Sequence, residues 1–159
     1  MLRQLSVFSE RLASCRALAF GGHRSPDGNK VTFSIDGIFI MEADGTNANQ
    51  LSNIRWDYWP YFSPTGDKIA FQVHTESDPY DLYVMDVDGG NQTLLENTIA
   101  WELNAQMWSA DGKRMVYSKP MNETVRSIFS VSVDDAASTQ LTFDHGDFAP
   151  VWRPTALTP

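Results

Sequence analysis

Short apolar runs alternate with polar segments along most of this chain. Ile38-Phe39-Ile40-Met41 and Leu82-Tyr83-Val84-Met85 are apolar at every position, which is typical of strands that are covered on both faces. Asp44-Gly45 and Asp88-Gly89 follow these runs, and such dipeptides favour tight hairpin turns. The pattern predicts an all-β protein made of short antiparallel strands.

The chain also repeats one turn-forming phrase. Ser25-Pro26-Asp27-Gly28 returns as Ser63-Pro64-Thr65-Gly66 and, in altered form, as Ser109-Ala110-Asp111-Gly112, so the starts lie 38 and 46 residues apart. A strand-rich repeat of roughly 40 residues is the period of a four-stranded propeller blade. The spacing therefore predicts a β-propeller built from four-stranded antiparallel blades.

Four runs follow one another in each repeat. The first runs are 31–34, 69–73 and 115–118, the second are 38–42, 81–86 and 127–133, the third end at 50–52, 93–95 and 140–142, and the fourth are 59–62, 105–108 and 149–152. Proline in the fourth run, at Pro60 and Pro150, is typical of an edge strand. We expect the fourth run to be the innermost strand, beside a central channel.

The order of these motifs resembles the TolB-type, WD-like β-propeller repeat. That pattern runs approximately P-x-W-S-P-D-G-K-x-I-A-F, then I-Y-V-M-D-x-D-G, then L-T, and residues 60–71 and 82–89 match it. His23-Arg24 departs from it where Pro-x-Trp would precede the first turn, and a fourth Ser-Pro-Asp-Gly is missing after Arg153. The chain divides accordingly into an N-terminal extension at 1–24 (a degenerate signal or a truncated blade), three repeats at 25–153 and a tail at 154–159.

The number of strands predicts about three blades. Segments 59–95 and 105–142 each hold four runs, whereas the first blade is expected to lack its innermost strand and 149–152 is a fourth run without a blade. The resemblance implies a ring of six or seven blades. The chain is then a partial propeller, either half of a six-bladed ring in which two copies exchange the terminal strand, or part of a longer chain.

Composition narrows the classes of partner. The 159 residues carry a formal net charge of −8, which argues against nucleic acid because phosphate recognition needs clustered Lys and Arg. Cys15 is the single cysteine, so no internal disulfide forms, and no apolar run is long enough for a transmembrane helix. Leu12-Ala13-Ser14-Cys15 resembles a lipobox, but Glu10 and Arg11 interrupt the apolar segment that should precede it. The resemblance implies the periplasm or cell envelope and leaves the cytoplasm open.

The candidate chemistry is sparse. Five acidic residues suggest calcium, but their spacing does not match an EF-hand loop and favours turn-forming aspartates: Asp44, Asp86, Asp88, Asp134 and Asp135. The three histidines, His23, His74 and His145, fall in different repeats without zinc-ligand spacing. No Gly-x-Ser-x-Gly, Walker or Rossmann motif occurs. The sequence predicts no catalytic residue, no metal and no cofactor.

A binding site is expected on the variable loops opposite the short turns, because such loops carry function on rigid scaffolds. The connections that enter the innermost strands hold aromatic, acidic and cationic residues, which we take as candidates for a channel-mouth site: Arg55, Trp56, Asp57, Trp101, Glu102, His145 and Asp147. Such a site suits a polar ligand or a peptide end. The alternative is that the aspartates cap turns and the tryptophans cover the rim of the core.

The resemblance implies a non-catalytic binding or scaffold module for a protein or a small polar ligand. Two enzymatic alternatives stay open. The first is a fragment of the gating propeller of a prolyl-oligopeptidase-like serine peptidase, whose nucleophile lies in a separate domain. The second is a sugar-processing propeller with a metal in its channel.

Overall fold

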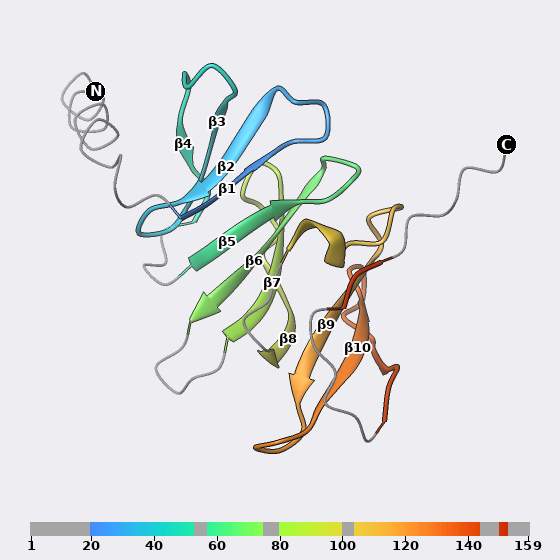
Figure 1. Cartoon of the computed structure of the whole chain (residues 1–159). Helices are drawn as coiled ribbons and strands as arrows, with labels where there is room; N and C mark the ends of the chain where they lie inside the picture. The colour runs from blue at the N-terminus through green and yellow to red at the C-terminus, as the bar shows by residue number, and fades with distance from the viewer. Residues whose placement is uncertain (1–19, 53–56, 75–79, 100–103, 144–149, 153–159) are drawn as a thin grey trace, which may run out of the picture.

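Three antiparallel sheets make up the part of the chain that the computed structural model describes, residues 20–52, 57–74, 80–99, 104–143 and 150–152 (Figure 1). Sheet A contains β1 (Phe20–Arg24), β2 (Lys30–Ser34), β3 (Ile38–Glu42) and β4 (Asn49–Gln50). Sheet B contains β5 (Asp57–Phe62), β6 (Lys68–His74), β7 (Tyr80–Asp86) and β8 (Thr93–Ile99). Sheet C contains β9 (Arg114–Pro120), β10 (Arg126–Ser132) and β11 (Ser138–Gln140), preceded by the 3₁₀ helix η2 (Ala105–Met107). The prediction of an all-β fold with antiparallel blades is confirmed.

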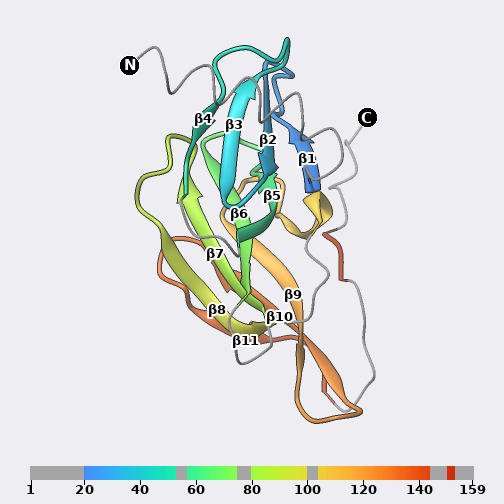
Figure 2. The ribbon, with the colours of Figure 1, turned by 90° about the vertical axis from the view of Figure 1, so that its left-hand side faces the viewer.

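The sheets follow one another in space in chain order (Figure 2). One core cluster joins sheet A to sheet B and includes Ile38, Phe62 and Phe71, and a second joins sheet B to sheet C and includes Leu82 and Tyr117. The middle strands of sheet B are therefore buried on both faces, as their continuous apolar sequence predicts.

Each repeated serine closes its turn with its own side chain. Ser25 Oγ donates to Asp27 Oδ1 (2.6 Å) and accepts the N–H of Lys30 (2.9 Å), and Ser109 Oγ accepts the N–H of Arg114 in the same way (2.9 Å). In each sheet, the turn after β3, β7 or β10 lies at the same end as the turn that begins with the repeated serine. A residue at the start of the later turn donates its backbone N–H to a carbonyl of the earlier turn. These bonds join Ala43 to Asn29, Val87 to Asp67 and Val133 to Lys113. Both kinds of turn therefore lie at one end of each sheet.

The first sheet corrects the predicted strand count. β1 pairs with β2 as the innermost strand of sheet A, so the expectation that this blade lacks its innermost strand is wrong. β1 lies inside the range 1–24 that the sequence assigned to an extension. Its residues Gly21-Gly22 and His23-Arg24 show no apolar alternation, so the sequence pattern does not mark a strand here. The segment becomes a strand by pairing with β2. The predicted exchange of a terminal strand between two copies loses its basis.

Two other predicted inner strands also differ. Residues 105–107 form η2, because the Asn104 side chain accepts the N–H of Gln106 (2.9 Å) and caps a helical turn, and only Trp108 bridges to Met115. Residues 150–152 form no strand. Pro150 has no N–H to give to a ladder, and the N–H of Trp152 donates to the carbonyl of Gln106 (2.8 Å).

In the described residues, no helix is both long and apolar enough to cross a membrane.

Candidate functional site

Asp57 is the one predicted site residue that the structure describes. It begins β5, and its side chain is buried between sheets A and B, with a relative exposure of 1%. The other candidates, which are Arg55, Trp56, Trp101, Glu102, His145 and Asp147, lie outside the described residues. Asp57 thus holds a structural position and does not face an accessible surface.

Asp57 is tied to the sheet before it. Ser52 Oγ accepts the N–H of Ile38 (2.9 Å) and donates to Asp57 Oδ2, so one hydroxyl links β3 to the start of β5. Asp57 Oδ1 is buried and has no hydrogen-bond partner among the described residues. Burial raises the pKa of Asp57 from 3.8 to about 6, against the lowering effect of the Ser52 hydrogen bond.

The third repeat has the counterpart of the Ser52–Ile38 hydrogen bond. Thr142 Oγ1 accepts the N–H of Ile128 (2.9 Å), as Ser52 does from Ile38. Asp147 follows Thr142 by five residues, as Asp57 follows Ser52. This spacing is a sequence signal that the loop argument missed, and at Asp57 it marks a buried link between sheets A and B.

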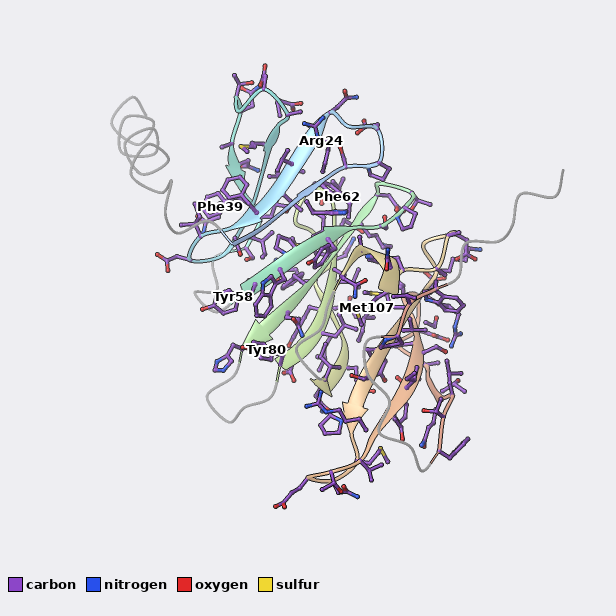
Figure 3. All side chains as sticks on the ribbon, in the orientation of Figure 1. Arg24, Phe39, Tyr58, Phe62, Tyr80 and Met107 are labelled. Atoms are coloured by element: carbon purple, nitrogen blue, oxygen red, sulfur yellow. The ribbon has the colours of Figure 1, made fainter. Side chains whose placement is uncertain are left out.

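Four half-buried aromatic side chains gather at the opposite end of sheet B from the Ser-Pro turns. They come from the start of β5, the end of β6 and the start of β7, and we call Tyr58, Trp59, His74 and Tyr80 the aromatic cluster. Ring centroids lie 5.7 Å apart for Tyr58–Trp59, 5.6 Å for Trp59–Tyr80 and 5.1 Å for His74–Tyr80. Figure 3 shows Tyr58 and Tyr80 together at this end, away from Phe62. The cluster occupies the end where the sequence predicted variable loops.

Trp59 has an unusual backbone. Its φ is +48°, in the left-handed region, and it lies in an irregular part of the β5–β6 ladder between Tyr58 and Tyr61. A non-glycine residue there costs about 1–2 kcal/mol. Gly21 has the equivalent place in β1 with φ +63°, and a Cβ on Gly21 would lie 3.0 Å from Trp59 Cδ1. The Trp59 ring therefore rests on the glycine of the neighbouring inner strand, and bulky residues held in this region are found mainly at functional sites.

His23 joins the two inner strands. Its Nδ1 accepts the N–H of Phe62 (3.1 Å), and its ring meets the edge of Tyr61 at 5.1 Å. Burial lowers the pKa of His23, which favours the neutral ring that such an acceptor needs. The described residues contain no group of three or more His, Cys, Asp or Glu placed to hold a metal ion.

A hollow of about 250 Å³ lies at the turn end, between the first two Ser-Pro turns, and Pro26, Phe62 and Val87 are among its lining residues. Its polar side chains are occupied by their own sheet: Asp27 accepts from Ser25 and Asn29, and Lys30 pairs with Glu42 at 2.7 Å. The hollow is a gap between two packed turns, so the aromatic cluster is the better candidate for ligand contact.

Comparison with solved structures defines the fold type. TolB from Acinetobacter baumannii superposes with a TM-score of 0.63 at 18% identity, over 80% of this chain and 33% of TolB. A putative TolB from Agrobacterium tumefaciens gives 0.61 at 24% identity, over 81% of this chain and 47% of that one. The chain has the TolB-type propeller fold. The propeller domain of the trilobed protease from Pyrococcus furiosus also shares it, with a TM-score of 0.57 at 15% identity, over 79% of this chain and 44% of that one.

The sequence relatives of this chain are longer proteins. An uncharacterised protein of Agrobacterium fabrum is 29% identical over 113 residues, which are 61% of this chain and 38% of that protein. Dipeptidyl-peptidase 5 of Porphyromonas gingivalis is 23% identical over 145 residues, which are 79% of this chain and 21% of the peptidase. No family model matches the sequence. The chain spans less than two fifths of either relative.

Proposed function

We propose that this chain is a section of a propeller that acts as a non-catalytic binding module, and that the aromatic cluster contacts the ligand. The observation that carries the proposal is Trp59. A strained backbone holds its half-buried ring beside Tyr58 and Tyr80, at the loop end of the innermost strand. Strained residues of this kind cluster at active sites and ligand-binding sites.

The ligand class that fits best is an extended peptide segment. Tyr and Trp are enriched at protein interfaces because they combine a large apolar face with a polar edge. Aromatic-lined surfaces take up extended and proline-rich peptides in particular. The net charge of −8 disfavours acidic segments and favours neutral or basic ones. The similarity to a dipeptidyl-peptidase is compatible with a fold that handles peptides.

A peptidase-gating section is the second candidate, supported by that relative and by the protease propeller. In that case the same cluster contacts the substrate peptide, while the nucleophile comes from outside these residues. Both candidates predict that the purified chain hydrolyses neither peptides nor esters. The predicted location in the periplasm or cell envelope stays a prediction.

The test uses a synthetic array of overlapping peptides, with proline-rich, basic and acidic sequences, and calorimetry on the best binder. Trp59→Gly removes the ring and keeps the backbone, because glycine occupies the equivalent place in β1. Affinity is expected to fall at least tenfold. The matched control is Phe143→Ala, which removes an aromatic ring that is 63% exposed outside the cluster and should leave affinity unchanged.

The proposal fails if no peptide on the array binds, or if Trp59→Gly and Phe143→Ala bind as tightly as the unaltered chain. Circular dichroism and a cooperative melting transition establish that each variant is folded before its affinity is measured.

A further inference from the structure

β5 is the edge strand of sheet B, and its start carries two members of the aromatic cluster, Tyr58 and Trp59. A peptide binds at such a place in one of two ways. It adds a strand to the sheet edge through backbone hydrogen bonds, or it docks as a polyproline II helix against aromatic rings. The two modes need different backbones in β5, so the local geometry distinguishes them.

The backbone of β5 is unsuited to strand addition. A ladder needs N–H and C=O groups that follow one another regularly along the edge. The β5–β6 register shifts between Tyr58 and Tyr61, and Trp59 has a φ of +48°, far from extended backbone. Pro60 follows with no N–H to donate. Irregularities and prolines of this kind protect sheet edges from pairing. A ligand at the aromatic cluster therefore depends on side-chain contacts.

The side chains of the cluster form a connected series of inclined rings. Successive centroids lie 5.1, 5.6 and 5.7 Å apart, and successive ring planes are inclined by 64°, 59° and 45°, along the series His74, Tyr80, Trp59, Tyr58. Rings inclined in this way form ridges and notches and do not make one flat platform. All four side chains are half-buried, so part of each ring surface is accessible. Such a row of rings matches the aromatic-lined grooves that take proline-rich segments.

A polyproline II helix also matches the polar edges of the rings. It has no internal hydrogen bonds, so its carbonyl groups stay available to donors. Tyrosine hydroxyls and the tryptophan indole N–H are donors at the edge of an apolar ring, and they bond such carbonyls without needing an N–H in return. Proline keeps the ligand backbone ordered before binding, which lowers the entropy cost of association.

Charge selects the residues beside the prolines. The cluster itself contains no carboxylate and no permanent cation, so the direct contact suits uncharged prolines. The formal net charge of the chain is −8, which attracts a segment with lysine or arginine beside its prolines and repels an acidic one.

We propose that the aromatic cluster binds a proline-rich segment in the polyproline II conformation, with lysine or arginine beside the prolines, through contacts with the rings. This inference rests on the peptide-binding function proposed above. It adds the conformation of the ligand and the absence of a β-ladder between the ligand and β5.

The experiment compares three synthetic peptides of about nine residues, the length of three polyproline II turns, by calorimetry on the full chain. The first is proline-rich with an arginine at each end, the second has alanine in place of every proline, and the third alternates valine and threonine between the same arginines to favour a strand. The proline-rich peptide is expected to bind about tenfold more tightly than either of the others. N-methylation of its remaining backbone N–H groups should leave the affinity within about twofold, because no ladder uses them.

Two substitutions at Tyr58 locate the contact. Tyr58→Leu removes the ring and is expected to weaken binding of the proline-rich peptide about tenfold. Tyr58→Phe is the matched variant, since it keeps the ring and loses only the hydroxyl, and it should weaken binding less than Tyr58→Leu does. A cooperative melting transition establishes that each variant is folded before its affinity is measured.

The outcomes separate this inference from the binding function itself. Equal or tighter binding of the alanine or valine–threonine peptide overturns the polyproline II inference, as does loss of binding on N-methylation or an equal loss in the two Tyr58 variants. In each of these cases the binding function stands as long as Trp59→Gly weakens the binding that remains. Absence of binding by all three peptides and by the whole peptide array overturns both.

Discussion

Replacing Asp57 with asparagine is expected to change how stability depends on pH. Asp57 is 1% exposed, and its Oδ2 accepts from Ser52 while Oδ1 has no partner in the described residues. Asparagine has nearly the same shape, keeps an oxygen that accepts from Ser52, and carries no charge at any pH. The variant therefore removes the ionisation of this site and little else.

The magnitude follows from the pKa. Burial raises the pKa of Asp57 from 3.8 to about 6, and each pKa unit corresponds to 1.36 kcal/mol, so ionising the folded protein costs about 3 kcal/mol. A carboxyl with a raised pKa is protonated more readily in the folded state. Its destabilising effect is therefore absent below pH 3.8, grows as the pH rises towards 6, and is complete above that. The free energy of unfolding of Asp57→Asn, relative to the unaltered protein, should rise by about 2.5 kcal/mol between pH 4 and pH 8, because Asp57 is already partly ionised in the unfolded chain at pH 4.

Urea unfolding at unit steps from pH 4 to pH 8 measures this difference. Other groups titrate as well. The pKa of Asp27 is lowered by hydrogen bonds, the most important of which comes from Ser25, and the pKa of His23 is lowered by burial. Stability from Asp27 is lost only as the pH falls below 3.8, and stability from neutral His23 is lost as the pH falls through 6.5. Both effects occur in both proteins and cancel in the difference. A difference for Asp57→Asn that stays constant from pH 4 to pH 8 would refute the reasoning.

Two further changes test the contacts between strands and sheets. Ser52→Ala leaves the N–H of Ile38 without its acceptor and Asp57 without its donor, so urea unfolding should show that the free energy of unfolding falls by about 1–3 kcal/mol. The pH dependence of that free energy should also show a higher pKa for Asp57, and an unchanged pKa would contradict the link between Ser52 and Asp57. Tyr117→Phe removes the hydroxyl that donates to Glu96 Oε2 (2.6 Å) between sheets B and C. Urea unfolding should show that the free energy of unfolding falls by about 1.5–3 kcal/mol. A fall below about 0.5 kcal/mol would mean that water replaces this hydrogen bond at no cost in stability.

The turns could be predicted from sequence because their chemistry is local. Ser25 and Ser109 reach backbone groups only five residues ahead, so the motif itself contains both partners of each hydrogen bond. Those turns fix the register of the strands on either side, and the apolar runs then supply both faces of the central strands. The predicted strands 31–34, 38–42 and 69–73 accordingly agree with β2, β3 and β6 to within one residue.

The predicted inner strand at 59–62 lies within β5, but the states of two other inner segments could not be predicted because they depend on contacts outside the repeated motif. Phe20–Arg24 becomes a strand through pairing with β2 and through the hydrogen bond between His23 and Phe62, 39 residues away. Ala105–Met107 becomes a helical turn because Asn104 caps it, although the repeat places an inner strand there. The aromatic cluster also depends on the fold, since it draws four residues from three strands, and no spacing in the sequence marks it.

Differences between repeats at one structural position are the most informative features of this chain. The left-handed position of the inner strand is filled by glycine in β1 and by tryptophan in β5, with similar φ values. Glycine meets the backbone requirement without strain, so the fold alone does not need a tryptophan there. What Trp59 adds, at a cost of about 1–2 kcal/mol, is a ring that packs on Gly21 and extends the surface formed by Tyr58 and Tyr80. That surface lies at the loop end of the inner strand and includes a side chain that packing alone does not require. Binding experiments should therefore begin there.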